Sequence, residues 1–249
     1  MIPWSSPFIW TRCVDSLLNL RRPEGIDVIF IRGTGWSPAR RHTDAVEKAL
    51  DQKAELLLFF GADQIAPPYL LERLCHRFFE GYAVINALVP SRGYFSNNVH
   101  TKPFQPLAWR WKSTPLSEEG RFVFRPYRNQ KLDGDMLEVV IPDGKVQPVH
   151  IIGSGCMIFH RDHITSLKRP WFQEAVDPLT YKRFANMDTR FSSRLIHEAG
   201  VLMWVDTSIK ILHLTDMAID TTFQDRFNDW MDPSIVNSES EIIQVERTK

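Results

Sequence analysis

Leu56-Leu57-Leu58-Phe59-Phe60-Gly61-Ala62-Asp63-Gln64 is the stretch of sequence that decides the fold. Five consecutive apolar residues that end at a glycine are typical of a strand buried on both faces of a sheet. We expect this strand to span residues 55–60. Its carboxyl end would then carry one carboxylate, that of Asp63.

Helices are predicted on both sides of this strand. Ser37 with Pro38 fits an N-cap followed by a first-turn proline, which opens a helix that runs through Lys53. Pro67 and Pro68 begin a second helix. Its apolar residues recur at helical spacing: Leu70, Leu71, Leu74 and Phe78.

The neighbouring segments continue this alternation, with a helix at 7–20 and strands at 27–31 and 82–89. Strands that alternate with helices imply a mostly parallel sheet covered by helices on both faces. In such sheets ligands bind at the carboxyl ends of the strands, here 61–65 and 90–92. The sequence therefore predicts an α/β fold with its site at that edge.

Residues 93–148 change character, because aromatic residues and prolines mix there with polar turns. This pattern predicts antiparallel ribbons and loops inserted into the sheet. Regularity returns in a glycine-interrupted strand region, a helix and two short strands, at 150–159, 189–199, 201–204 and 209–212. We expect a single domain over 1–249, with a polar C-terminal extension at 216–249.

The composition limits the classes of function. With 30 basic and 30 acidic residues the formal net charge is zero, so no basic excess indicates nucleic acid or an anionic membrane as the main partner. The longest apolar runs are too short to span a bilayer, and no signal sequence is evident, which predicts a cytoplasmic protein. Cys13, Cys75 and Cys156 are odd in number and far apart, which favours buried free thiols.

Asp63 is the first candidate site residue. A hard divalent cation bound to a diphosphate needs only one or two protein carboxylates, because the phosphates supply other oxygens. Asp63 suits that task, and the alternative is a turn former or an N-cap ahead of Pro67.

This segment resembles the aspartate-x-aspartate element of the GT-A glycosyltransferases, a fold with a Rossmann-like, mostly parallel sheet. In that family the strand ends in two acids and the second holds the metal on the nucleotide sugar. Gly61 stands here at the first position and Asp63 at the second. Ser37-Pro38-Ala39-Arg40-Arg41 is similar to the Ala-Arg-Asn run that opens the preceding helix. The resemblance implies that Arg40 contacts donor phosphate, and pairing with a neighbouring acid is the alternative.

Two further segments extend the resemblance. Ile152-Gly153-Ser154-Gly155-Cys156-Met157-Ile158 resembles the glycine-containing strand beside the donor sugar, which implies donor contacts for Gly153, Ser154 and Gly155. A simple strand bulge is the alternative. Trp171-Phe172 resembles an aromatic segment that lines the acceptor side, and the alternative is an aromatic pair in the core.

The strongest match is Met187-Asp188-Thr189-Arg190-Phe191, followed by Glu198-Ala199-Gly200 and Ile211-Leu212-His213-Leu214. It resembles the family run in which an acidic pair opens a helix, a glycine ends it, and a later strand ends in histidine. Asp188 matches the second acid, the catalytic base of inverting members, and an N-cap is the alternative.

His213 is expected to leave its strand at the same edge as Asp63. The resemblance implies that the two share a divalent cation, because neutral imidazole beside a carboxylate and a diphosphate completes a Mn²⁺ or Mg²⁺ shell. The alternative is a histidine with a purely structural role.

Over roughly residues 27–92 and 150–214, the resemblance implies a metal-dependent glycosyltransferase. Sugar would pass from a nucleotide-sugar donor to an acceptor hydroxyl of a glycan, lipid-linked sugar, protein or other molecule, with inversion. One rival is a degenerate member that binds nucleotide or glycan without turnover, because Gly61 and Met187 replace two acids. Another is a nucleotidyltransferase, but Gly33-Thr34-Gly35 lacks the lysine that its phosphate loop needs.

Overall fold

The computed structural model describes residues 2–3, 11–90, 95–96, 99–100, 107–111, 137–176 and 183–214. The chain divides into two units, Met1–Leu214 and Thr215–Lys249, and every described element belongs to the first. The predicted extension 216–249 lies outside the described residues, as does much of the predicted insert.

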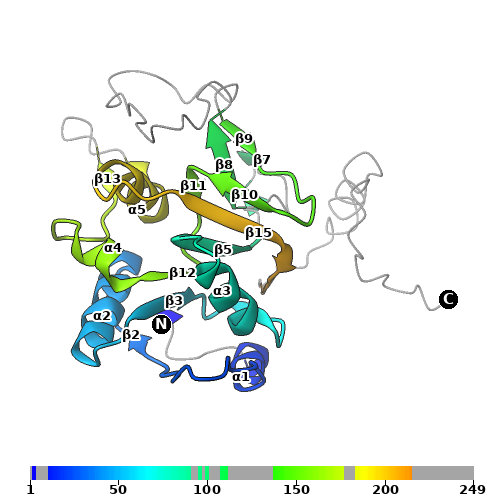
Figure 1. Ribbon diagram of the computed structural model, residues 1–249. Coiled ribbons are helices and arrows are strands. Elements are labelled where there is room, and N and C mark those ends of the chain that lie inside the picture. Colours follow the sequence, from blue (N-terminus) through cyan, green and yellow to red (C-terminus); the bar gives the residue numbers. More distant parts are fainter. Residues whose placement is uncertain are drawn as a thin grey trace. The chain divides into compact units, whose positions relative to one another are not determined.

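A five-stranded sheet forms the centre of the described unit (Figure 1). Its strands, in spatial order, are β10 (Val146–Val149), β15 (Met203–Lys210), β5 (Val84–Leu88), β12 (Cys156–His160) and β3 (Leu56–Phe60). Only β15 and β5 pair in parallel, and the other three pairings are antiparallel. The α/β class is confirmed, but the expectation of a mostly parallel sheet is wrong, because β12 lies between β3 and β5 and runs against both.

The strand directions still create the edge that the site requires. Because β12 is antiparallel to both β3 and β5, those two strands run the same way, and β15 runs with β5. The carboxyl ends of β3, β5 and β15 therefore meet at one edge, together with the amino end of β12. The Gly61 amide donates to the Gly155 carbonyl over 2.8 Å at this edge.

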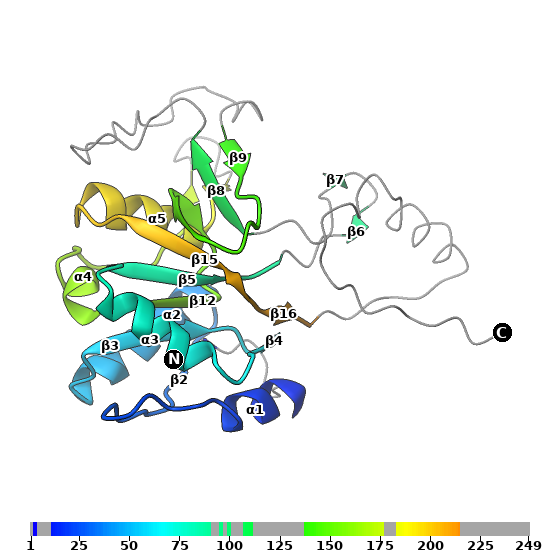
Figure 2. The same cartoon turned by 45° about the vertical axis from the view of Figure 1, so that its right-hand side comes forward.

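Helices cover both faces of the sheet (Figure 2). On one face lie α2 (Pro38–Asp51), α4 (Arg161–Thr165) and α5 (Met187–His197), and on the other lie α1 (Thr11–Leu18) and α3 (Leu70–Phe79). Successive residues of β3 alternate between the two cores, with Leu57 and Phe59 in one and Phe60 in the other. The predicted buried strand and its flanking helices are confirmed.

Short strand pairs complete the unit. They are β1 (Ile2–Pro3) with β2 (Arg32–Gly33), β4 (Gln64–Ile65) with β16 (Leu212–His213), β6 (Phe95–Ser96) with β7 (Val99–His100), and β13 (Ala175–Val176) with β14 (Arg183–Ala185). A small three-stranded sheet is also present, with β8 (Ala108–Trp111) between β11 (Ile151–Ile152) and β9 (Leu137–Val139). The described parts of the insert are antiparallel, as predicted. The strand expected at 27–31 is wrong: Ile29 and Phe30 are each half exposed, so this apolar run does not enter the sheet.

No helix in the described ranges combines the length and apolar character that crossing a membrane would require.

Candidate functional site

The pairing of β4 with β16 brings Asp63 and His213 together. In this ladder His213 lies opposite Gln64, and the Leu214 amide donates to the Asp63 carbonyl over 2.7 Å. His213 Nε2 lies 3.5 Å from Asp63 Oδ1. Two residues 150 positions apart in the chain thus face each other beyond the ends of β3 and β15.

A hydrogen bond to the backbone fixes the orientation of the His213 ring. Nδ1 lies 2.8 Å from the Pro90 carbonyl oxygen, which can only accept, so Nδ1 carries the hydrogen. When the ring is neutral, Nε2 presents a lone pair toward the Asp63 carboxylate. Histidines that bind metals hold their second nitrogen in this way.

The observed separation fits a shared divalent cation. Bonds of about 2.1 Å from one ion to each atom, at angles between octahedral and tetrahedral, separate the two ligand atoms by roughly 3.0–3.4 Å. The 3.5 Å between His213 Nε2 and Asp63 Oδ1 needs little adjustment. No cluster of three or more metal-ligating side chains occurs in the described ranges, so further ligands would come from phosphate and water.

Gln64 explains two of the glycines at this edge. A Cβ on Gly155 would lie 2.3 Å from Gln64 Nε2, and a Cβ on Gly61 would lie 2.8 Å from Gln64 Cδ and 3.0 Å from Asp63 Oδ1. Gln64 is buried, and its Oε1 accepts from the Gly61 amide over 3.3 Å. The glycines therefore make room for the side chain that follows Asp63.

Asp188 is not the N-cap of α5. Asn186 is the cap, because its side chain accepts from the Thr189 amide over 2.8 Å. Asp188 lies in the first turn, where a negative charge is favoured, and its Oδ1 accepts from Ser154 Oγ over 2.6 Å. The cap alternative for Asp188 therefore fails, and its second carboxylate oxygen has no hydrogen bond from any described residue.

Ser154 also contacts His42, a residue that the sequence analysis did not single out. Ser154 Oγ lies 3.0 Å from His42 Nε2, so its hydroxyl lies between two side chains, and its predicted donor contact stays a prediction. Gly153 takes part in backbone pairing, since its amide donates to the Leu107 carbonyl over 3.0 Å. His42 directly follows the Ser37-Pro38-Ala39-Arg40-Arg41 run, but nothing in that run identifies its partner.

The remaining candidates divide between surface and core. Arg40 is exposed at the start of α2, and within the described ranges its guanidinium makes no ion pair. Trp171 and Phe172 are each only 3% exposed. Phe172 packs on Phe191 and on His42, with ring centroids 4.5 and 5.1 Å away, and the acceptor contacts of Trp171 and Phe172 stay a prediction.

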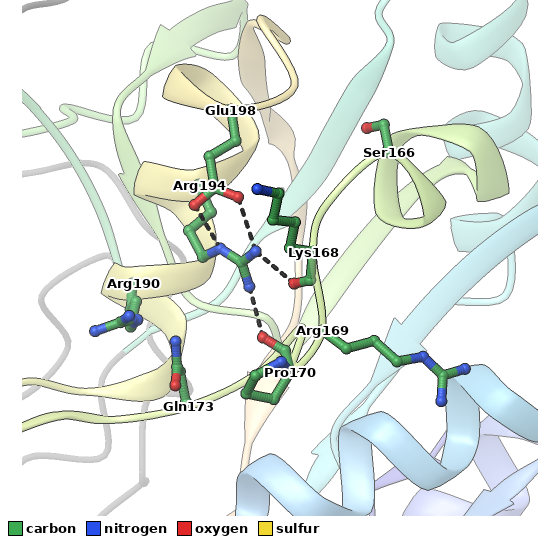
Figure 3. A pocket seen from close by; sticks show the side chains of 8 residues that line it. All are labelled: Ser166, Lys168, Arg169, Pro170, Gln173, Arg190, Arg194 and Glu198. Atoms are coloured by element: carbon green, nitrogen blue, oxygen red, sulfur yellow. Dashed lines mark hydrogen bonds and ion pairs between the residues drawn. The ribbon is translucent and has the colours of Figure 1, made fainter.

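A separate pocket of about 530 Å³ lies between α5 and the segment after α4 (Figure 3). Arg194 lines the pocket, and its guanidinium is fixed in place. Glu198 accepts two of the Arg194 N–H groups at 2.8 Å, and the carbonyls of 168, 170 and 171 accept the others. Lys168 and Arg190 add further positive charge to the lining. The pocket suits an anionic group, and no sequence motif indicated it.

Comparisons with known proteins support the fold. No protein-family model matches the chain, and a search of curated proteins finds no match. Solved structures do match, among them A197 from STIV, with a TM-score of 0.52 and 16% sequence identity. The alignment covers 86% of this chain and 84% of that one. At this identity the likeness concerns the fold alone.

Proposed function

We propose that this protein is a metal-dependent glycosyltransferase of the GT-A type, which moves a sugar from a nucleotide-sugar donor to an acceptor hydroxyl with inversion. The observation that carries the proposal is the facing pair of Asp63 Oδ1 and His213 Nε2, 3.5 Å apart where the strands end. A carboxylate and an oriented imidazole lone pair at that separation are the protein's share of a divalent cation site.

Four of the candidate residues have a chemical task in this proposal. Asp63 and His213 would hold Mn²⁺ or Mg²⁺, and the cation would neutralise charge on the departing diphosphate. Arg40, exposed at the start of α2, would meet a donor phosphate. Asp188 would take the proton of the acceptor hydroxyl with the carboxylate oxygen that no described residue contacts.

One backbone segment, the turn at Ser154 and Gly155, contacts both the proposed base and the neighbour of the proposed cation ligand. Ser154 bonds Asp188, and the next residue, Gly155, packs against Gln64, the neighbour of Asp63. The turn before β12 therefore links the proposed base with the proposed cation site. The contacts of this turn would help to hold the two groups in a fixed geometry, which a displacement reaction requires.

The first test measures nucleotide binding by thermal unfolding. A panel of nucleoside diphosphates with Mn²⁺ should contain one that stabilises the protein by about 2.7 kcal/mol at a hundred times its Kd, or roughly 5–10 °C in Tm. Asp63→Ala and His213→Ala should each abolish the shift. Asp51→Ala, an exposed carboxylate at the end of α2, is the control and should keep it.

The second test measures turnover with nucleotide sugars and Mn²⁺, scored as sugar released to water or acceptor. Asp188→Asn should bind the donor like the wild type while transfer falls by roughly two to four powers of ten. Binding without turnover in the wild type would favour the non-catalytic rival. A Tm that no nucleotide changes would contradict the proposed function.

A further inference from the structure

Asp188 lies at one end of a chain of hydrogen-bonded side chains whose other members, Ser154 and His42, are buried and have no task in the proposed reaction. It runs from Asp188 through Ser154 to His42 and ends at the Pro38 carbonyl. His42 is 5% exposed and packs against Phe59, with ring centroids 5.0 Å apart. The protons of this chain can be counted from the geometry.

The His42 ring is held in one neutral form. Nδ1 lies 2.9 Å from the Pro38 carbonyl oxygen, which only accepts, so Nδ1 carries a hydrogen. Burial lowers the pKa of His42, and although the charge of Asp188 opposes this effect, that of Arg41 adds to it. Among the described residues these are the charged groups that face the ring. His42 Nε2 is therefore an acceptor.

Ser154 then faces two acceptors with a single proton. Its Oγ is 2.6 Å from Asp188 Oδ1 and 3.0 Å from His42 Nε2. While Asp188 is ionised, the hydroxyl can satisfy one of them and leaves the other without a donor. A buried acceptor without a donor is costly, so the chain lacks one proton.

One added proton completes every bond of the chain. A protonated Asp188 can donate to Ser154 Oγ, which frees the Ser154 hydroxyl to donate to His42 Nε2, while Nδ1 continues to donate to Pro38. We propose that Ser154 and His42 are positioning residues for Asp188, forming a hydroxyl switch that favours proton uptake by its carboxylate. The proposal rests on the proposed function, in which that proton comes from the acceptor.

The step balances. The acceptor O–H bond breaks and its proton passes to the outer oxygen of Asp188, while the acceptor oxygen bonds to the sugar carbon. The bond from that carbon to the diphosphate breaks, and its electron pair leaves with the nucleotide. The Asp188 carboxyl turns its new O–H toward Ser154, whose hydroxyl turns to His42. Release of the proton to water reverses both turns.

Nitrogen NMR of His42 tests the switch without any substrate. In Asp188→Asn the amide N–H can donate to Ser154 as a protonated carboxyl would, so the Nε2 resonance should move toward a hydrogen-bonded acceptor. Adding Ser154→Ala should cancel this movement. Ser192→Ala is the matched control, because within the described part of the chain that buried serine of α5 bonds only Ile152, and it should change nothing.

Kinetics supply the second readout. Ser154→Ala and His42→Phe, which keeps an aromatic ring against Phe59, should each lower kcat roughly two- to tenfold, the size of one ordinary hydrogen bond. The donor KM should not change, and neither variant should lower the residual rate of Asp188→Asn further. If Ser154→Ala or His42→Phe lowered kcat in the Asp188→Asn protein as much as in the wild type, the switch would be overturned.

The NMR and activity measurements distinguish a failure of the hydroxyl switch from a failure of the proposed function. An Nε2–H tautomer or a charged ring in the wild type, or an Nε2 signal that Asp188→Asn leaves in place, would overturn the switch whatever the activity. Absence of any sugar transfer by the wild type would overturn the proposed function and leave the NMR result standing.

Discussion

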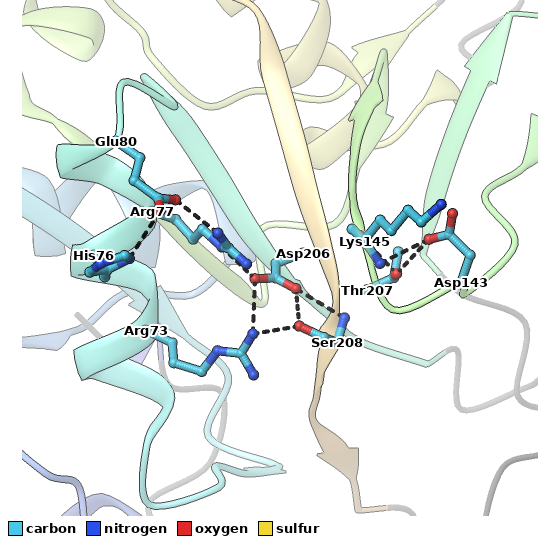
Figure 4. A network of polar contacts seen from close by, with 9 residues as sticks. All are labelled: Arg73, His76, Arg77, Glu80, Asp143, Lys145, Asp206, Thr207 and Ser208. Atoms are coloured by element: carbon cyan, nitrogen blue, oxygen red, sulfur yellow. Dashed lines mark hydrogen bonds and ion pairs between the residues drawn. The ribbon is translucent and has the colours of Figure 1, made fainter.

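Asp206 offers a stringent test of how the edge of the sheet is held to the helix beside it (Figure 4). Its side chain is fully buried, and Oδ2 accepts from Arg77 Nε over 2.9 Å and lies 3.6 Å from Arg73. Oδ1 accepts from the amide and the hydroxyl of Ser208. One carboxylate thus pairs with two arginines that lie one turn apart on α3.

The magnitude follows from these contacts. Removing one partner of a buried ion pair costs about 3–5 kcal/mol, and Asp206→Ala should fall near the lower limit, because both arginines keep part of their surface in water. Asp206→Asn keeps the shape and the bond to the Ser208 amide. It loses the charge-assisted bond to Arg77, and should cost about 2 kcal/mol.

Urea unfolding of the full chain at neutral pH measures both values. Glu80→Gln is the control, because Glu80 is the exposed second partner of Arg77, and it should change the stability much less. An Asp206→Asn variant no less stable than Glu80→Gln would refute the reasoning.

The pH dependence of stability gives a second check on Asp206, because the direction of its pKa shift fixes the pH range in which the stabilisation is lost. The Ser208 and Arg77 hydrogen bonds outweigh burial and hold the pKa of Asp206 below its usual value. The stabilisation is therefore complete above a pH of about 3.9, the unfolded value, and is lost as pH falls through the lower folded pKa. The gap between wild type and Asp206→Asn should close in acid, and a gap that persists there would contradict this assignment.

Two further predictions concern single side chains. Asn186→Ala should destabilise the fold by about 1 kcal/mol, through loss of the α5 cap, whereas Asn186→Asp should not, and equal urea midpoints for both would contradict the capping role. Asn86→Leu should stabilise the protein by about 1–3 kcal/mol. Asn86 is fully buried in β5, and no described residue bonds either atom of its amide, while leucine keeps the number and branching of heavy atoms. A lower urea midpoint would show that the amide has a partner such as buried water.

Local signals in the sequence predicted the elements well. Ser37 and Pro38 mark the start of α2 because the cap and the first-turn proline act within one turn. The apolar run 56–60 predicts β3 because consecutive apolar residues place apolar side chains on both faces of a strand, which is stable only when both faces are buried. The start of α5 was misplaced by two residues, since Asn186 and Asp188 are equally good caps and only the fold chooses between them.

Long-range pairing was beyond those signals. The position of β12 between β3 and β5 depends on pairing between residues such as Met157 and Asn86, or Cys156 and Phe60, which lie far apart in the chain, and periodicity does not encode it. The candidate site likewise has one part that the sequence predicts and one part that it does not. Asp63 and His213 could be paired because motif order places both at strand ends, whereas His42 and Ser154 meet across 112 positions without any shared motif.

Packing accounts for Gly61 and Met187, which stand where the motifs that these segments resemble have acids. Met187 is 7% exposed in the same core as Phe191, so a carboxylate there would lose its hydration without a partner. At Gly61 even a Cβ would lie 2.8 Å from Gln64 Cδ. Both positions reject an acid for local reasons, and the acids that remain, Asp63 and Asp188, are each held by specific contacts.

Gly61→Asp, which restores the first acid of the family motif, tests this argument. The new Cβ would also lie 3.0 Å from Asp63 Oδ1, and Gln64, being buried, has little room to move aside. Overpacking of this kind costs about 1–3 kcal/mol. We therefore expect lower stability in urea and loss of the nucleotide-dependent rise in Tm, because the Asp63 loop is displaced. Gly61→Asp combined with Gln64→Ala should recover the stability, since the clash is with that side chain. A Gly61→Asp variant that is as stable as the wild type and binds nucleotide more tightly would show that the glycine is a lost ligand position, not a packing requirement.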